Sequence, residues 1–165
     1  MTTTAPAPTS APTGGRQWPA LLVFAAAVVV VAVVGGLAAG SSGETYDALD
    51  LPPYAPPSWL FGPVWTVLYV MIAVAGWLAW RRTGTDRATV VYGVQLVLNM
   101  AWTPLFFAAG WYTVALVEIV ALLAAVLLTI AMFARRSRAA AWLLAPYAAW
   151  VAFATALNAG IVVLN

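Results

Sequence analysis

The stretch LPPYAPPSWLFGPVWTVLY, residues 51–69, contains the transition that decides the fold. The four prolines in its first seven residues fix φ and bias the preceding residues toward extended backbone, so no helix forms across them. From Trp59 onward the chain is apolar, and the next charged residue is Arg81. An uncharged apolar run of about 20 residues can cross the roughly 30 Å core of a bilayer as a helix. We therefore interpret the stretch as a loop outside a membrane that leads into a transmembrane helix.

The rest of the chain contains further apolar segments of similar length. With the first they make five, near residues 18–40, 60–80, 88–108, 111–134 and 139–163. The mean hydropathy is +0.94 and 7% of the residues are charged, against roughly 25% in soluble domains. We predict an all-α membrane protein, a bundle of five transmembrane helices over residues 18–165 with a Pro-rich lid loop between helices one and two. A Thr-, Ala- and Pro-rich tail, residues 1–17, is expected to be disordered.

The first apolar segment has an alternative interpretation as a cleaved signal peptide, because LAAGSSG, residues 37–43, resembles a small-residue cleavage site. Its apolar run is longer than the roughly 7 to 15 residues of a signal sequence. A transmembrane helix is therefore the favoured interpretation.

The charged residues predict an orientation. The loop between the first two segments carries Glu44, Asp47 and Asp50 and no basic residue. The basic residues flank the other side of every segment and are all arginine: Arg16, Arg81, Arg82, Arg87, Arg135, Arg136 and Arg138. The positive-inside rule then predicts a cytoplasmic N-terminus, with the first loop and the C-terminus external. A bacterial cytoplasmic membrane is expected, because outer-membrane spanners are usually barrels. Short later connections predict that helices two to five pack as antiparallel neighbours.

Several classes of chemistry are excluded by composition. The chain has no cysteine and no histidine, which excludes disulfides, thiolate and imidazole catalysis, and zinc or His-ligated haem sites. We predict no metal site and no required cofactor. The net charge of +2 serves membrane orientation and is too small to indicate a nucleic-acid partner.

Residues that are unusual inside a membrane recur at helical spacing in three segments. The three stripes are Trp65, Tyr69, Ile72 and Gly76; Gln95, Asn99, Trp102 and Phe106; and Tyr147, Trp150, Ala154 and Asn158. Steps of three and four place each set on one helix face, and polar members should face the bundle interior. Counted from the helix ends, most of these residues share the outer half of the membrane. Aromatic walls, a few amides and a small residue predict a pocket for a flat apolar ligand.

Each of these features also has a structural explanation. The amides of Gln95, Asn99 and Asn158 can serve only to link helices by hydrogen bonds. Glu118 is expected to be protonated or bonded to a neighbouring amide or hydroxyl. Six tryptophans near helix ends fit an interfacial belt: Trp18, Trp59, Trp77, Trp80, Trp111 and Trp142. The row Ala152, Ala156 and Gly160 is typical of close helix contact, within the chain or between copies.

Four stretches together resemble the TspO/MBR family, the tryptophan-rich sensory and translocator proteins once called peripheral benzodiazepine receptors. They are TYDALDLPPYAPPSWLFGPVWTVLY at 45–69, LVLNMAWTPLFF at 96–107, ARRSRAAAWLL at 134–144 and PYAAWVAFATALN at 146–158. The resemblance implies a five-helix bundle, commonly a homodimer, that binds porphyrins such as protoporphyrin IX under the loop between helices one and two. It implies ligand contacts from Tyr46, Pro56, Trp65, Asn99, Trp102, Trp150, Phe153 and Ala154, with Tyr54 and Pro57 in the lid loop.

This chain departs from the family pattern in two places. Tyr54 stands where the family usually has tryptophan, which keeps an aromatic residue in the loop and alters its stacking. Animal members need a tyrosine followed by a basic residue near the end of helix five to bind cholesterol. After Tyr147 no Lys or Arg follows, so that route to cholesterol is unsupported.

The resemblance and the stripes predict an integral membrane protein that binds a porphyrin, or another flat lipophilic molecule, and senses or regulates its level. One alternative is a light-dependent porphyrin-degrading enzyme, with Trp65 and Trp150 in a photochemical role. Another is a passive translocator of lipophilic ligands, because the chain lacks the paired intramembrane charges of ion-coupled carriers.

Overall fold

The computed structural model describes residues 17–40 and 42–165. Most of the predicted tail lies outside the described residues, and Gln17, its last residue, instead begins the first helix. The elements are α1 (Gln17–Ala39), α2 (Ser42–Asp47), the 3-10 turn η2 (Ser58–Leu60), α3 (Phe61–Thr83), α4 (Arg87–Thr103), the π-helical turn η3 (Pro104–Ala108), α5 (Tyr112–Ala134) and α6 (Arg138–Leu164).

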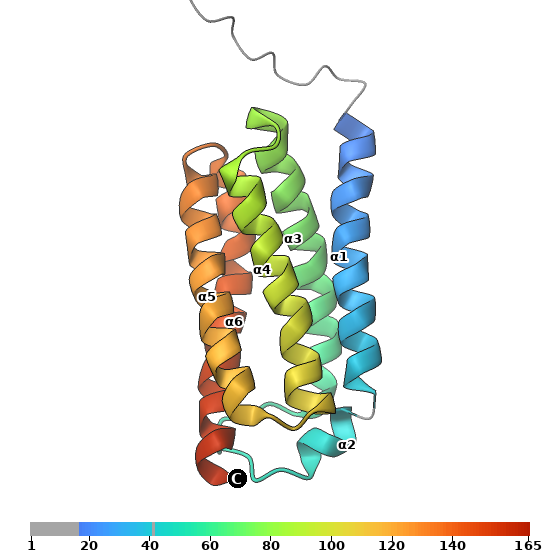
Figure 1. Cartoon of the computed structure of the whole chain (residues 1–165), viewed down its shortest axis with the longest axis vertical. Coiled ribbons are helices and arrows are strands. Elements are labelled where there is room, and N and C mark those ends of the chain that lie inside the picture. The colour runs from blue at the N-terminus through green and yellow to red at the C-terminus, as the bar shows by residue number, and fades with distance from the viewer. Residues whose placement is uncertain (1–16, 41) are drawn as a thin grey trace, which may run out of the picture.

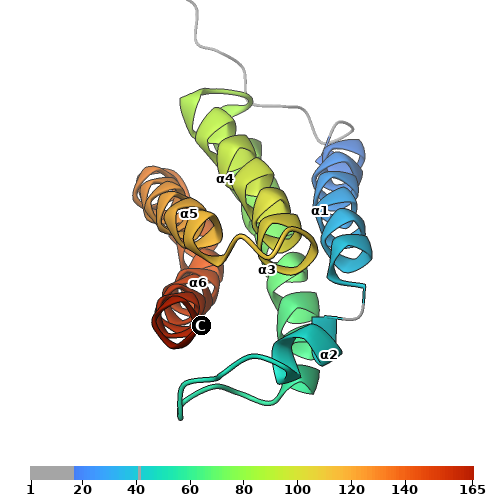
Figure 2. The ribbon, with the colours of Figure 1, turned by 60° about the horizontal axis from the view of Figure 1, so that its bottom comes forward.

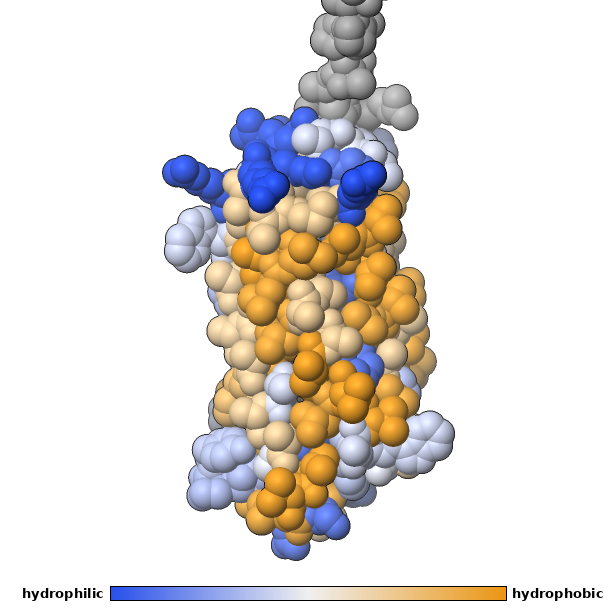
Figure 3. All heavy atoms as spheres, turned by 60° about the vertical axis from the view of Figure 1, so that its left-hand side comes forward, coloured by the Kyte–Doolittle hydropathy of each residue, from blue (hydrophilic) through white to orange (hydrophobic). Residues whose placement is uncertain are grey.

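The predicted all-helical fold with five spans is confirmed. Within the described residues, five helical stretches are long and apolar enough to cross a membrane: Trp18–Ala39, Ser58–Thr83, Arg87–Ala108, Tyr112–Ala134 and Arg138–Leu164. They run side by side (Figure 1), and on the face in Figure 3 apolar side chains cover most of their length. Hydrophilic residues gather at one end, where α3 ends and α4 and α6 begin. We call this the arginine end, and the opposite end, which holds α2 and the C-terminus, the loop end.

The five long helices form a closed ring in the order α1, α3, α6, α5, α4, each contacting the next (Figure 2). The predicted antiparallel pairing of neighbours is correct for α4 with α5 and for α5 with α6. It is wrong for α3 and α4, which are consecutive in sequence but meet mainly through side chains. The Tyr92 hydroxyl donates to the Ile72 carbonyl oxygen (3.1 Å), and Tyr69 donates to Asn99 Oδ1 (3.3 Å). These long side chains hold the two helices apart, so the ring has an interior.

The interior is filled at the arginine end. Tyr92 stacks on Phe133 with ring centroids 5.9 Å apart and meets Phe24 edge-on at 5.7 Å. A Cβ atom built on Gly76 would lie 2.7 Å from Tyr92 and 2.8 Å from Phe24, which leaves no room for any side chain. The end is closed by Asp86, which caps α4 by accepting from Ala88 N and Thr89 N and pairs with Arg136 from the α5–α6 turn.

The connection between α1 and α3 was predicted as a loop throughout, but its first part forms the short helix α2 before the prolines begin. After α2 the chain passes across the loop end to α6 and returns to α3 (Figure 2). Tyr54 donates its hydroxyl to the Ala156 carbonyl oxygen (2.9 Å), and Asn165 exchanges two hydrogen bonds with the backbone of Asp50. Gly160 provides the space, since a Cβ there would lie 2.7 Å from the Tyr54 hydroxyl. At Gly160 the small-residue row of α6 is therefore covered by residues 42–57, which we call the α1–α3 segment, whereas the side chains of Ala152 and Ala156 are exposed.

Candidate functional site: a cavity at the loop end

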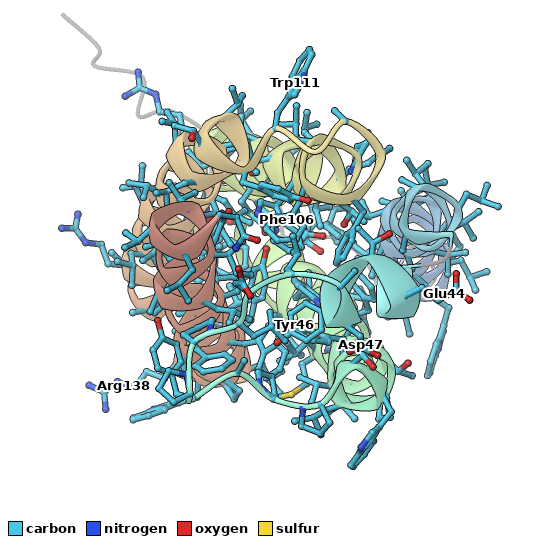
Figure 4. All side chains as sticks on the ribbon, turned by 90° about the horizontal axis from the view of Figure 1, so that it is seen from below. Glu44, Tyr46, Asp47, Phe106, Trp111 and Arg138 are labelled. Atoms are coloured by element: carbon cyan, nitrogen blue, oxygen red, sulfur yellow. The ribbon has the colours of Figure 1, made fainter. Side chains whose placement is uncertain are left out.

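The loop end of the ring encloses a cavity of about 330 Å³, within the size range of small-molecule sites. Its walls come from α1, α2, α3, α4, η3 and α6, and its aromatic members are Tyr46, Phe61, Trp65, Tyr69, Trp102, Phe106 and Phe107. Seen from the loop end, Tyr46 and Phe106 point toward the interior, whereas Trp111 points away (Figure 4). Trp102 stacks on Phe106 (5.1 Å) and Trp65 on Tyr69 (5.2 Å). Because each ring is held by another, the walls keep flat apolar surfaces facing the space.

A few polar groups are held in place within these walls. Asn99 accepts from Tyr69 and donates from Nδ2 to the Tyr147 hydroxyl (3.1 Å), which in turn donates to Gln95 Oε1 (3.0 Å). Asn158 accepts from Trp102 Nε1 (3.4 Å) and donates to the Tyr112 carbonyl oxygen (3.0 Å).

These bonds answer one question that the sequence left open. Gln95 links helices and does not line the cavity, whereas Asn99 and Asn158 do both. Polar groups that are already satisfied by protein partners orient a ligand weakly, so shape and stacking dominate this site.

The structure brings five of the predicted ligand contacts to the cavity wall: Tyr46, Trp65, Asn99, Trp102 and Ala154. Trp150 lies behind that wall, where it lines a separate void of about 20 Å³ with Phe61, Trp65 and Ala154 among others. Its ring meets Phe61 edge-on (5.9 Å) and lies tilted against Phe153 (5.5 Å).

The remaining predicted residues lie in or beside the α1–α3 segment and do not line the main cavity. Pro56 contributes its carbonyl oxygen, which accepts a hydrogen bond from the Tyr46 hydroxyl (3.1 Å). Phe153 packs with a second cluster of buried residues around Tyr46 and Phe106. Pro57 precedes η2, and Tyr54 reaches α6. Within the α1–α3 segment the cavity is lined by Ser42, Gly43 and Tyr46 of α2.

Sequence reasoning missed the wall that α1 contributes. This wall consists of Ala32, Gly35, Gly36 and Ala39. A Cβ on Gly35 would lie 3.5 Å from Thr103 Oγ1, whereas one on Gly36 would meet nothing within 4 Å. The signal was the small-residue run GGLAAG at 35–40, which lacks the polar and aromatic residues by which the other walls were found.

The charges of the site lie around the cavity and not in it. Among the described residues, none of the side chains that line the cavity is ionisable except those of Tyr46 and Tyr69. Glu44, Asp47 and Asp50 are exposed on the α1–α3 segment. Burial, and after it the negative charge of Asp47, raises the pKa of the Tyr46 hydroxyl above its ordinary value. Tyr46 therefore remains a neutral hydrogen-bond donor at physiological pH.

Four buried polar atoms in the described part of the chain have no hydrogen-bond partner. They are Gln95 Nε2, both carboxyl oxygens of Glu118 and Trp150 Nε1. The predicted bond from Glu118 to an amide or hydroxyl is thus not formed. No group of three or more potential metal ligands occurs within the described residues. The arrangement suits binding by shape and stacking.

Fold and site together define a class: a five-helix membrane protein with an aromatic cavity beneath one end of the bundle. The chain matches the family model described as the TspO/MBR family over residues 23–164. It is 39% identical over 142 residues to tryptophan-rich protein TspO of Archaeoglobus fulgidus, covering 84% of this chain and 92% of that protein. It is 40% identical over 127 residues to the human translocator protein, covering 72% and 73%. It is 33% identical over 142 residues to the tryptophan-rich sensory protein of Cereibacter sphaeroides, covering 86% and 89%. The chain belongs to the TspO/MBR family.

Proposed function

We propose that the protein binds a flat lipophilic molecule of the porphyrin class in the loop-end cavity and acts as a sensor or regulator of its level. The observation that carries the proposal is the cavity itself, walled by Trp65, Trp102 and Phe106 and bordered by the amides of Asn99 and Asn158. A conjugated macrocycle gains most from such walls, because offset stacking on an aromatic ring adds about 0.5–1.5 kcal/mol beyond the area that it buries. The names of two relatives, translocator and sensory protein, support a role in handling or detecting a small molecule.

The α1–α3 segment serves in this proposal as a lid. Two sets of hydrogen bonds hold it closed on the C-terminal part of the chain, Tyr54 to Ala156 and Asn165 to Asp50. A bond from Tyr46 to Pro56 braces the segment internally. Prolines restrict its unfolded alternatives, so the ordering cost on closing is small. We place the lid outside a bacterial cytoplasmic membrane and the arginine end inside, as the positive-inside rule requires.

The test is a titration of purified protein in a neutral detergent with protoporphyrin IX, followed by quenching of tryptophan fluorescence. Saturable binding is expected for the unmodified chain. Gly35→Leu, which places an isobutyl group in the cavity, is expected to weaken binding at least tenfold, because stacking surface is lost.

The matched control is Gly93→Leu. Gly93 is also helical and a Cβ there meets nothing within 4 Å, but it does not line this cavity. Both substitutions gain helix propensity of similar size, about 1 kcal/mol, so a difference in binding reports the cavity and not the fold. Equal affinities for the two variants would place the ligand elsewhere and end the proposal.

A further inference from the structure

The helices α1 and α3 are in contact over much of their length. Near the arginine end, the rings of Trp18 and Trp77 have centroids 6.3 Å apart. Closer to the loop end, a Cβ atom built on Gly35 would lie 3.8 Å from the Tyr69 hydroxyl. Between these two levels, the interface leaves the loop-end cavity no route to the surface.

Beyond Gly35, toward the loop end, the cavity reaches the surface between the same two helices. Among the described residues that line the cavity, three are exposed, namely Gly36 of α1 and Gly62 and Thr66 of α3. Cβ atoms built on Gly36 and Gly62 would meet nothing within 4 Å. The two glycines therefore leave open space beside the cavity, and we call the place marked by these three residues the side opening.

Helical register places the three residues of the side opening on facing flanks. Gly36 follows Trp18 by about five turns, so the two residues share a face of α1. Thr66 precedes Trp77 by about three turns and shares its face of α3, and Gly62 lies about one turn before Thr66. Because the two tryptophan rings contact each other, these faces of α1 and α3 are turned toward one another.

The side opening lies within the membrane-spanning part of the bundle. Its residues belong to the spans Trp18–Ala39 and Ser58–Thr83, and Thr66 lies roughly 12 Å from the start of its span at about 1.5 Å per residue. The Thr66 hydroxyl donates to the Gly62 carbonyl oxygen (2.9 Å). A lipophilic molecule that passes here thus meets glycine backbone and a hydroxyl that already has a partner, and it breaks no bond between the two helices.

The side of the cavity that faces the loop end is more strongly held. There α2 lies between the ends of α1 and α3 (Figure 2). Its Asp47 carboxylate accepts a hydrogen bond from Ser58 Oγ (3.3 Å), and its Tyr46 ring meets the Phe61 ring edge-on (5.2 Å). Entry past α2 would break these contacts, whereas the side opening is present while α2 is in place.

We propose that lipophilic ligands reach the cavity sideways from the bilayer, through the side opening between α1 and α3. This inference rests on the proposed function and adds its route: the ligand dissolves in the bilayer first and then moves between the two helices. The substrate class is thereby molecules that partition into lipid. Loosening the α1–α3 segment speeds the same passage, because α2 borders the side opening at the loop end.

The experiment attaches a bulky, removable group at the side opening. The chain has no cysteine, so Thr66→Cys supplies a single thiol that benzyl methanethiosulfonate modifies and a reductant restores. The matched control is Val67→Cys, because Val67 is the next residue of α3 and is 60% exposed but does not line the cavity. Each full-length variant is placed in phosphatidylcholine vesicles, and binding of protoporphyrin IX is followed by stopped-flow quenching of tryptophan fluorescence.

Modified Thr66→Cys is expected to bind and to release the porphyrin at least about tenfold more slowly than the unmodified variant, because an obstructed route slows passage in both directions. Reduction is expected to restore both rates, and modified Val67→Cys is expected to keep its rates. A group that only removed a binding contact would instead speed release.

The outcomes separate the two proposals. Absence of saturable binding by the unmodified chain overturns the proposed function, and this inference with it. Saturable binding with equal rates for the two modified variants overturns the inference alone, as does faster release from modified Thr66→Cys.

A second pair of variants repeats the test if Thr66→Cys does not fold. Gly62→Cys takes its place, with Gly93→Cys as the control. Both glycines are helical, and a Cβ on either would meet nothing within 4 Å, but only Gly62 lines the cavity. Equal porphyrin association rates for these two modified variants would likewise overturn the inference.

Discussion

The two ends of one helical ring differ in what fills them. At the arginine end, rings from three helices interlock around Gly76, and the Asp86–Arg136 pair closes the bundle. At the loop end, the same helices part around a cavity that α2 also lines, and the segment that contains α2 is hydrogen-bonded to Ala156 and Asn165. In a membrane, helices associate by packing and polar contacts, because moving an apolar side chain from lipid into the protein gives no hydrophobic free energy. The arginine end therefore supplies stability, and the loop end has space for a ligand.

The largest predicted effect comes from adding a side chain to the packed interior of the arginine end. Gly76→Leu is expected to destabilise the protein by about 3 kcal/mol or to prevent folding, because its Cβ alone would lie 2.7 Å from Tyr92. Tyr92 cannot move aside easily, since it is 2% exposed and its hydroxyl is bonded to the Ile72 carbonyl. Thermal unfolding in detergent, followed by circular dichroism, measures the loss.

A glycine-to-leucine substitution at the loop end tests whether the two ends differ in stability. Gly35 lines the cavity, and Gly35→Leu is expected to keep or slightly raise the unfolding temperature while it weakens ligand binding. If Gly76→Leu and Gly35→Leu shifted the unfolding temperature equally, the two ends would not differ in the way that the packing indicates.

The second largest effect is expected at the border between the ends. Tyr147→Phe removes the hydroxyl that joins Asn99 to Gln95, and both amides are nearly fully buried. We expect a loss of about 1–2 kcal/mol, because two buried groups lose a partner. Tyr69→Phe is the control: it removes one bond to Asn99 from a less buried ring and should cost less. A larger loss for Tyr69→Phe would contradict the central role of Tyr147.

The sequence predicted the helices well because hydropathy and arginine placement act locally. The spans begin and end within a few residues of the predicted bounds, and Asp86 and Ser137 cap α4 and α6 next to the arginines that marked the turns. The order of the ring was not predictable in the same way. Consecutive α3 and α4 are kept apart by the long side chains of Tyr92 and Tyr69, a packing effect that no local pattern encodes.

The candidate site was predictable where a stripe carried polar or aromatic residues. Trp65, Asn99, Trp102 and Ala154 were chosen from helical spacing, and all line the cavity. A stripe covers a face at least about 100° wide, so it could not tell that Trp150 turns toward Phe61 and Phe153 instead. The small residues of α1 were missed because they only leave room for the cavity. They carry none of the polar or aromatic side chains that marked the other walls.

A third prediction concerns the clasp at the arginine end, by which we mean the Asp86 cap of α4 together with its ion pair to Arg136. Asp86→Ala is expected to cost about 1–2 kcal/mol, since it removes the α4 cap and the Arg136 partner together. Asp86→Asn keeps a capping oxygen and loses only the charge, so it should cost less than about 1 kcal/mol. Equal losses for the two variants would show that the ion pair, and not the cap, supplies the stability.

The clasp also predicts a pH dependence. Burial alone raises the pKa of the Asp86 carboxyl, but hydrogen bonds from Arg136 and the Thr89 backbone outweigh it and lower the pKa below the ordinary 3.8. The folded state then binds the proton more weakly than the unfolded state. The stabilisation is complete above about pH 4 and is lost as the pH falls through the folded pKa. Acid unfolding of Asp86→Ala should lack this component.

The smallest predicted effect tests Tyr54, the lid-loop residue at which the resemblance to the family implied a tryptophan. The Tyr54 hydroxyl donates to the Ala156 carbonyl oxygen beside Gly160, where that hydroxyl and Pro52 already fill the space that a side chain would need. Tyr54→Phe is expected to destabilise the closed position of the α1–α3 segment by about 0.5–1 kcal/mol, because it removes one hydrogen bond and leaves the ring in place. We expect ligand release to speed up about threefold in stopped-flow fluorescence, with an unchanged unfolding temperature. Tyr54→Trp, whose indole N–H lies elsewhere on a larger ring, is expected to speed release at least as much, because Gly160 leaves no further room. Slower release from Tyr54→Trp would mean that stacking, and not this hydrogen bond, holds the segment closed.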